Sequence, residues 1–138
     1  MRTRLILLLL LGSALVATLE AQNADYHPDG GWRAPREAAA RTNPLQATPE
    51  IVGGGRKLFV RHCAECHRGD GQGSKRAADL LLPLVQEQSD GTLFWKITNG
   101  NPRRRMPSWG RLPEPQRWQL VLYLRALRPS AAGAGTSK

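Results

Sequence analysis

The pentapeptide Cys63-Ala64-Glu65-Cys66-His67 constrains this chain more than any other stretch. Side chains three or four residues apart in one turn of helix lie on the same face, so the two thiols and the imidazole are neighbours. The C-x-x-C-H spacing is typical of c-type haem attachment. Two thiols so placed can each add to one vinyl group of a porphyrin, and His67 then lies below the iron. The pattern predicts one covalent haem c held by Cys63 and Cys66, with His67 as proximal ligand.

Three other uses of paired cysteines remain as alternatives. A zinc site needs four ligands, and a chain with two Cys and three His offers only Cys63, Cys66, His67 and the distant His27. A dithiol redox motif is expected beside a β-α-β pattern, which is not visible in the sequence. A structural disulfide would suit an exported protein. Haem attachment is favoured over these three alternatives because the C-x-x-C-H spacing and the flanking features described below both fit a haem protein.

The N-terminal stretch predicts export. Two arginines in Met1–Arg4 precede the apolar run Leu5–Leu19, and Ala21 follows as a cleavage point, so residues 1–21 are expected to be a signal peptide. The run is shorter than the roughly 20 residues that span a bilayer, although an uncleaved anchor is the alternative. We expect a periplasmic or otherwise exported protein, whose thiols would not stay free in an oxidising compartment.

Length and charge limit the partners. The 138 residues suffice for one small domain, and 20 Lys+Arg against 11 Asp+Glu give a net charge of +9. Such a surface favours acidic partners. Nucleic acid is not expected as a partner, because the chain lacks a recognisable nucleic-acid motif and is predicted to be exported.

A helix is predicted to begin at Thr48-Pro49-Glu50, which offers an N-cap, a proline at the first helical position and an acid near the positive helix end. Gly55 lies on the apolar stripe of this helix. A glycine there indicates that another helix crosses at close range. The stripe consists of Ile51, Gly55, Leu58, Phe59 and His62.

Three further segments complete the expected all-α domain. An apolar wall is expected over Leu80–Val85, broken by Pro83. A helix over Asp90–Asn99 is capped by Ser89, ends at Gly100 and has Leu93, Phe94 and Ile97 on its apolar face. The last helix spans Pro113–Arg128 and is apolar most of the way round, which predicts that it is largely buried.

The two ends of the chain are expected to lie outside this domain. Residues 22–47 are rich in turn-forming residues, with a short helix expected around Arg36–Arg41, and Tyr26 and Trp32 favour a packed strap over a free linker. Residues 129–138 are small and polar and are expected to be a disordered tail.

Met106 is the candidate for the sixth iron ligand. It is the only methionine left once residues 1–21 are removed, and it lies in a proline-containing loop after Arg103-Arg104-Arg105. A thioether is a suitable haem ligand, and His/Met ligation raises the reduction potential. The alternative is that Met106 fills a gap in the core.

Residues 48–128 resemble a mono-haem class I cytochrome c. The residues that carry the resemblance are Gly55, Phe59, Cys63, Cys66, His67, Met106, Trp109, Trp118, Tyr123 and Leu124. The resemblance implies a small cytochrome c fold, with an N-terminal helix crossing a C-terminal helix beside one covalently attached haem. The Met-Pro-x-Trp pattern at Met106–Trp109 is similar to that of small bacterial cytochrome domains, including those of oxidase and dehydrogenase complexes.

One feature departs from the family pattern. The family commonly has a proline about twelve residues after the haem histidine, whose carbonyl receives the imidazole N–H. The corresponding stretch here is Ala78-Asp79-Leu80, and the nearest proline is Pro83. An acceptor that orients the imidazole is still expected, but the sequence does not name it.

These observations predict an exported one-electron carrier. With His67 and Met106 both on the iron, no coordination position remains for a small-molecule substrate, so catalysis is not expected. The expected partners are redox proteins. Arg103-Arg104-Arg105 are expected either to steer an acidic docking face of the partner or to form a solvated charge run with no such role. The alternatives are a cytochrome c subunit of an oxidase or dehydrogenase complex at the membrane, and a haem-based sensor whose sixth ligand dissociates.

Overall fold

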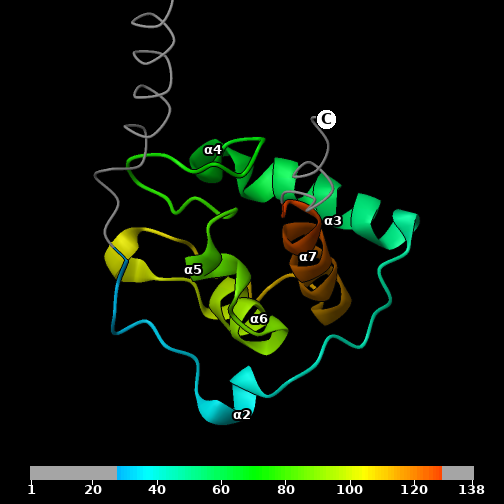
Figure 1. Cartoon of the computed structure of the whole chain (residues 1–138), viewed down its shortest axis with the longest axis horizontal. Helices are drawn as coiled ribbons and strands as arrows, with labels where there is room; N and C mark the ends of the chain where they lie inside the picture. The colour runs from blue at the N-terminus through cyan, green and yellow to red at the C-terminus, as the bar shows by residue number, and fades with distance from the viewer. Residues whose placement is uncertain (1–27, 129–138) are drawn as a thin grey trace, which may run out of the picture.

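The computed structural model describes residues 28–128, so the expected signal peptide, His27 and the expected tail lie outside the described residues. Residues 28–128 contain helices and no strand, with isolated backbone pairings only at Ser74–Ala77 and Asn101–Met106 (Figure 1). This confirms the predicted all-α class. The helices in chain order are α2 (Arg36–Ala39), α3 (Pro49–His62), α4 (Ala64–His67), α5 (Pro83–Gln86), α6 (Asp90–Asn99), the 3-10 helix η2 (Pro102–Arg104) and α7 (Glu114–Ala126).

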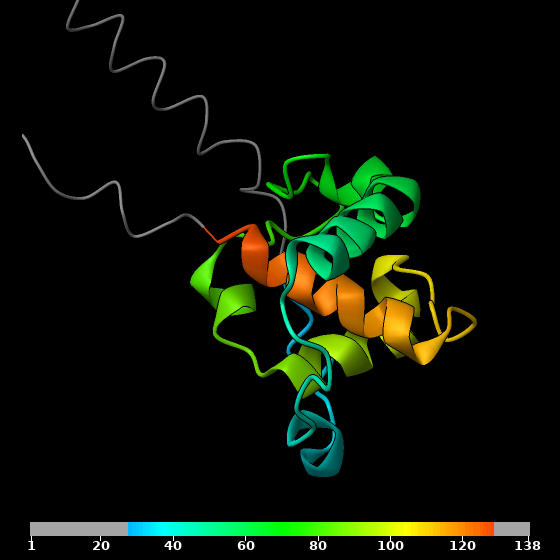
Figure 2. The same ribbon diagram turned by 90° about the vertical axis from the view of Figure 1, so that its right-hand side faces the viewer.

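The crossing of α3 and α7 is the main helix–helix contact of the fold, and Figure 2 shows α3 running across α7. The Thr48 hydroxyl oxygen accepts a hydrogen bond from the Ile51 N–H at 3.3 Å, which confirms the predicted cap of α3. A Cβ atom added to Gly55 would lie 2.1 Å from the carbonyl oxygen of Gln119 in α7. The close approach expected at Gly55 is therefore confirmed, because only a residue without a side chain fits there.

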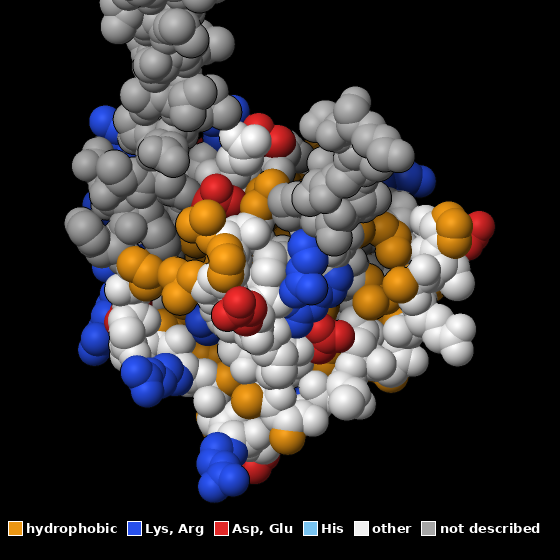
Figure 3. Space-filling view, in the orientation of Figure 1, with side chains coloured by type: hydrophobic (Ala, Val, Ile, Leu, Met, Phe, Trp, Pro, Cys, Tyr) orange, Lys and Arg blue, Asp and Glu red, His pale blue; other side chains and the backbone are white. Residues whose placement is uncertain are grey.

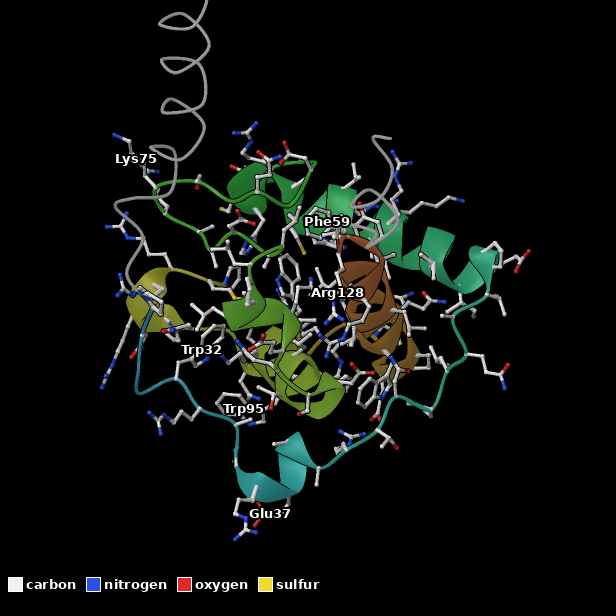
Figure 4. The ribbon with its side chains drawn as sticks, viewed as in Figure 1. Trp32, Glu37, Phe59, Lys75, Trp95 and Arg128 are labelled. Carbon is white, nitrogen blue, oxygen red and sulfur yellow. The ribbon has the colours of Figure 1, made fainter. Side chains whose placement is uncertain are left out.

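The core lies between α3, α6 and α7. The ring of Phe59 in α3 packs on Tyr123 in α7 at 5.2 Å between centroids, and Phe94 in α6 stacks on Trp118 at 4.0 Å. Figure 4 shows Phe59 between α3 and α7. The buried apolar residues are Phe59, Ala77, Leu80, Val85, Leu93, Phe94, Ile97, Trp118, Leu120, Val121, Leu122, Tyr123 and Leu124.

The limits of α6 are those that the sequence predicts. The Ser89 hydroxyl oxygen accepts the Thr92 N–H at 3.1 Å, and Gly100 ends the helix with φ at +66°. The last helix is shorter than the expected Pro113–Arg128, because Pro113 precedes its first turn and Leu127 already caps its C-terminus.

The apolar wall expected over Leu80–Val85 is only partly correct. Leu80 and Val85 are buried, but Leu82 and Leu84 are 46% and 56% exposed. Pro83 is the first residue of α5, so the proline starts a short helix here and turns alternate leucines outward. Figure 3 shows hydrophobic side chains gathered on the surface over α5.

Residues 28–47, which we call the strap, pack along α6 and onto the start of α7 (Figure 1). The Ser89 hydroxyl donates to the Ala39 carbonyl at 2.6 Å, and the Asn43 side-chain amide donates to the Trp118 carbonyl at 3.1 Å. The Arg41 guanidinium lies 4.6 Å from the centre of the Phe94 ring. These contacts fit the packed strap that Trp32 and Tyr26 favoured, although Tyr26 itself lies outside the described residues.

Within residues 28–128 no helix has the length and apolar character needed to cross a bilayer.

Candidate functional site

The attachment turn, Cys63–His67, follows directly from the end of α3. The Cys63 N–H donates to the Phe59 carbonyl at 2.8 Å and so closes the last turn of α3. The Cys63 carbonyl then accepts the N–H of His67 at 2.9 Å, which is the first bond of α4. The structure thus gathers Cys63, Cys66 and His67 on one helical turn, as their spacing predicts.

The orientation of His67 is fixed by a backbone carbonyl. The His67 Nδ1 atom lies 2.9 Å from the carbonyl oxygen of Ala78. Since a carbonyl only accepts, Nδ1 carries the proton and Nε2 keeps its lone pair. That is the tautomer in which an imidazole binds a metal through Nε2 and is held by its other nitrogen.

Two glycines fold the intervening loop back so that Ala78 reaches His67. Gly71 and Gly73 have φ of +77° and +74°, in the region that residues with side chains avoid. The Gly73 N–H donates to the His67 carbonyl at 3.0 Å, and the Leu80 N–H donates to the Gly71 carbonyl at 2.8 Å. Glycines at alternate positions after His67 permit such a turn, but their spacing does not specify which carbonyl reaches the imidazole.

Burial favours the neutral form of the His67 imidazole. His67 is half-buried, and this burial lowers its pKa, which the hydrogen bond to Ala78 only partly opposes. A neutral imidazole has the free lone pair that metal coordination requires.

The two thiols differ in their surroundings. Cys63 is half-buried against the core, whereas Cys66 is exposed. Burial, with a smaller contribution from the Cys66 thiol, raises the pKa of Cys63 to about 12. Reactive redox cysteines have a lowered pKa, so the environment of Cys63 argues against the dithiol redox alternative.

The other two alternatives also find little support in the structure. Cys63 and Cys66, which are the two cysteines of the chain, are not joined by a disulfide. Among residues 28–128 there is no cluster of three or more His, Cys, Asp or Glu side chains able to hold a metal ion. His27, the fourth ligand of the weak zinc hypothesis, lies outside the described residues.

Met106 lies in a loop of its own, closed on itself at its base. Its N–H donates to the Asn101 carbonyl at 3.0 Å, and its carbonyl accepts the Asn101 N–H at 2.9 Å. Arg105, in the left-handed region with φ at +58°, turns the chain after η2. Met106 is half-buried, unlike the exposed Arg103, Arg104 and Arg105 before it.

The arginine run has one acidic neighbour that the sequence did not reveal. The charges of Arg103 and Arg104 contribute to the lowered pKa of Asp29 in the strap, after hydrogen bonds from Gly31 and Asn101 as the main causes. Figure 3 shows Lys and Arg side chains at several separate places on this face, near its centre as well as at its edge. The basic side chains are therefore spread over this face, and part of the charge near Met106 is offset by Asp29.

The donor set on the attachment turn fits a c-type haem: two unbridged thiols beside a neutral imidazole that is oriented by a carbonyl. The helical fold and this turn define a small mono-haem c-type cytochrome domain. Residues 52–124 match the family described as cytochrome c oxidase, cbb3-type, subunit III, and the chain belongs to that family. No curated protein matches the chain at a significant level. The resemblance to c-type cytochromes is confirmed, and the family implies a haem c electron carrier.

Proposed function

We propose that this protein is an exported carrier of single electrons that binds one haem c covalently through Cys63 and Cys66, with His67 and Met106 as axial ligands. The observation that carries the proposal is the 2.9 Å hydrogen bond between His67 Nδ1 and the Ala78 carbonyl, inside the attachment turn. Haem iron supplies a reversible one-electron change between ferric and ferrous states.

The two cysteines would each form one thioether. Each thiol would add across one vinyl double bond of the haem, with its sulfur bonding to one carbon and its hydrogen to the other, so the attachment would need no oxidant. Cys66 is exposed and Cys63 is half-buried. Both thiols are capped in the product, as an oxidising compartment requires.

The two axial side chains would set the chemistry of the site. His67 offers Nε2 to the metal, while the Ala78 carbonyl holds its ring and increases its basicity. Met106 offers a soft thioether, which favours the ferrous state and raises the reduction potential. With both positions filled, the protein transfers electrons and does not act as an enzyme.

The partners are redox proteins of the periplasm or its equivalent. The family description favours a place beside a terminal oxidase, either as a subunit or as a mobile carrier. The exposed arginines before Met106 favour an acidic docking face on the partner.

A redox titration of the purified protein tests this proposal. We expect a single reversible transition with the slope of one electron, and no carbon monoxide binding to the reduced protein at neutral pH. The variant Met106→Ala should bind carbon monoxide and have a lower potential, because the open position and the lost thioether both disfavour the ferrous six-coordinate state. A wild-type protein that binds carbon monoxide as readily as Met106→Ala would favour a haem sensor instead.

A further inference from the structure

The start of the strap contacts the base of the loop that carries Met106. In Figure 1 the first described residues of the strap run beside the loop that contains η2. Two side chains of the strap, Asp29 and Trp32, make hydrogen bonds to two consecutive residues, Gly100 and Asn101. The partners are 68 and 72 residues apart in sequence, so these are tertiary contacts that no local pattern forecasts.

Asn101 joins the strap to Met106. Only 3% of Asn101 is exposed, and its main-chain N–H and C=O both pair with Met106, at 2.9 and 3.0 Å. Its side-chain amide donates to the Asp29 carboxylate at 3.3 Å. A buried amide must find such partners, so a shift of Asp29 moves the residue that fixes both backbone groups of Met106.

Trp32 holds the preceding residue. Its indole N–H donates to the Gly100 carbonyl at 2.8 Å. Its ring is in turn fixed to α6, because the Lys96 ammonium lies 4.6 Å from the ring centre, close enough for a cation–π contact. Figure 4 shows Trp32 on the side of the molecule that carries the η2 loop.

The backbone at Gly100 packs closely against the backbone of Met106. Its φ is +66°, and a Cβ atom there would lie 2.6 Å from the Met106 carbonyl oxygen. The chain therefore passes Gly100 and Met106 in close contact, and the Trp32 hydrogen bond acts at the point where the loop closes.

We propose that Asp29 and Trp32 are positioning residues for Met106, and that the strap keeps the Met106 loop closed against the iron. The inference rests on the proposed role of Met106 as axial ligand. It goes beyond the family, because Asp29 and Trp32 lie outside the matched residues 52–124. The strap thereby becomes a part of the haem site.

The test compares strap variants of the haem-loaded protein. Trp32→Phe removes the N–H donor and keeps an aromatic ring over Lys96, whereas Trp32→Ala and Asp29→Ala remove whole side chains. One hydrogen bond has a net value near a factor of ten in an equilibrium, so we expect an open Met106 loop to be about three to ten times more populated in each variant. The readouts are carbon monoxide binding to the reduced protein, the far-red absorption band of methionine-ligated ferric haem, and hydrogen exchange of the Met106 amide.

Asn43→Ala is the control at the α7 end of the strap. It removes the 3.1 Å hydrogen bond to the Trp118 carbonyl, together with the local bond that the Leu45 N–H donates to Asn43, and leaves the contacts to Gly100 and Asn101 in place. We expect this variant to be less stable overall but to exclude carbon monoxide and keep the far-red band. If the Met106 loop opens equally in Asn43→Ala and Trp32→Phe, the inference is overturned, because general destabilisation of the protein would then explain the opening.

The outcomes separate this inference from the proposed function. If the wild-type protein binds carbon monoxide as well as Met106→Ala does, Met106 is not a stable ligand and both proposals fail. If the wild-type protein excludes carbon monoxide and Trp32→Phe, Trp32→Ala and Asp29→Ala exclude it equally, only the positioning role fails. Increased binding in these three variants, with protection of the Met106 amide reduced, supports it.

Discussion

His67 Nδ1 and the carbonyl oxygen of Ala78 lie 2.9 Å apart and join the attachment turn to a residue eleven positions further along the chain. This contact supplies the acceptor that the sequence did not name, in the place of the proline carbonyl that is common in the family. A backbone carbonyl needs no particular side chain, so an alanine serves as well as a proline once the loop brings it into position.

The glycines that shape this loop should therefore affect how strongly the His67 imidazole donates to the iron. Gly73→Ala introduces a Cβ atom 2.6 Å from the Ala78 carbonyl oxygen at a φ of +74°, so Ala78 must move. We expect a raised reduction potential, because an imidazole that loses its acceptor donates less to ferric iron, and a stability loss of about 1–3 kcal/mol. Potentiometry and thermal unfolding measure the two effects.

Gly69→Ala is the control within the same loop, because nothing lies within 4 Å of a Cβ atom at Gly69. It should leave the potential unchanged. An equal shift of the potential in both variants would show that the loop as a whole, and not the Ala78 carbonyl, affects His67.

The crossing of α3 and α7 gives a prediction about stability. Gly55→Ala places a methyl group 2.1 Å from the Gln119 carbonyl oxygen, so the two helices must separate. We expect a loss of about 1–3 kcal/mol in the free energy of unfolding, or more, as for overpacked cores. Chemical denaturation of the haem-loaded protein measures it.

Gly53→Ala provides the contrast, since a Cβ atom at Gly53 meets nothing within 4 Å. Alanine in the helix should raise the free energy of unfolding by up to about 1 kcal/mol. The account of the crossing fails if both substitutions change stability in the same direction and by similar amounts.

Glu114 at the start of α7 gives a prediction about pH. The Trp118 indole N–H and the Arg41 guanidinium donate to it at 3.2 and 2.5 Å, and these bonds lower the pKa of Glu114 below its ordinary value of 4.5. A carboxyl whose pKa is lowered on folding stabilises the protein above pH 4.5, and this contribution disappears as the pH falls through the lowered pKa. Glu114→Gln should therefore reduce the melting temperature at neutral pH, with the gap to wild type narrowing in acid.

A double-mutant cycle isolates the contribution of the Arg41 contact. Glu114→Gln should cost less in an Arg41→Gln background than in the wild type, because the charged partner is already gone. An unchanged cost would mean that Arg41 does not stabilise the Glu114 carboxylate.

The exposed arginines before Met106 should act on the rate of electron transfer. Replacing Arg103, Arg104 and Arg105 together with Gln should slow transfer with an acidic partner at low salt and flatten its dependence on ionic strength. Stopped-flow mixing measures both effects. Replacement of Arg56, Lys57 and Arg61 on α3 removes the same charge elsewhere and should have a smaller effect. Rates at low salt that do not change on replacing the Arg103–Arg105 run would disprove steering by it.

The sequence predicted the features that depend on local spacing. The Thr48 and Ser89 caps, the close approach at Gly55 and the attachment turn all follow from residues a few positions apart. The acceptor for His67 could not be found in this way, because it depends on how Gly71 and Gly73 turn the loop.

The contacts of the strap were also beyond the sequence patterns. Trp32 suggested packing, but nothing near it in the chain identifies Gly100, 68 residues away, as the acceptor of its indole N–H. The exposure of Leu82 and Leu84 was missed for a related reason: an apolar run indicates burial, whereas the short helix starting at Pro83 turns part of the run outward.

Covalent capture of haem by Cys63 and Cys66 is tested most directly by acid-acetone extraction of the purified protein, followed by a pyridine haemochrome spectrum. We predict that the haem stays with the wild-type polypeptide, with the spectrum of two thioether bonds, and is extracted from the Cys63→Ala/Cys66→Ala double variant. A wild-type protein that is colourless, or that releases its haem into the acetone, would contradict the proposed function.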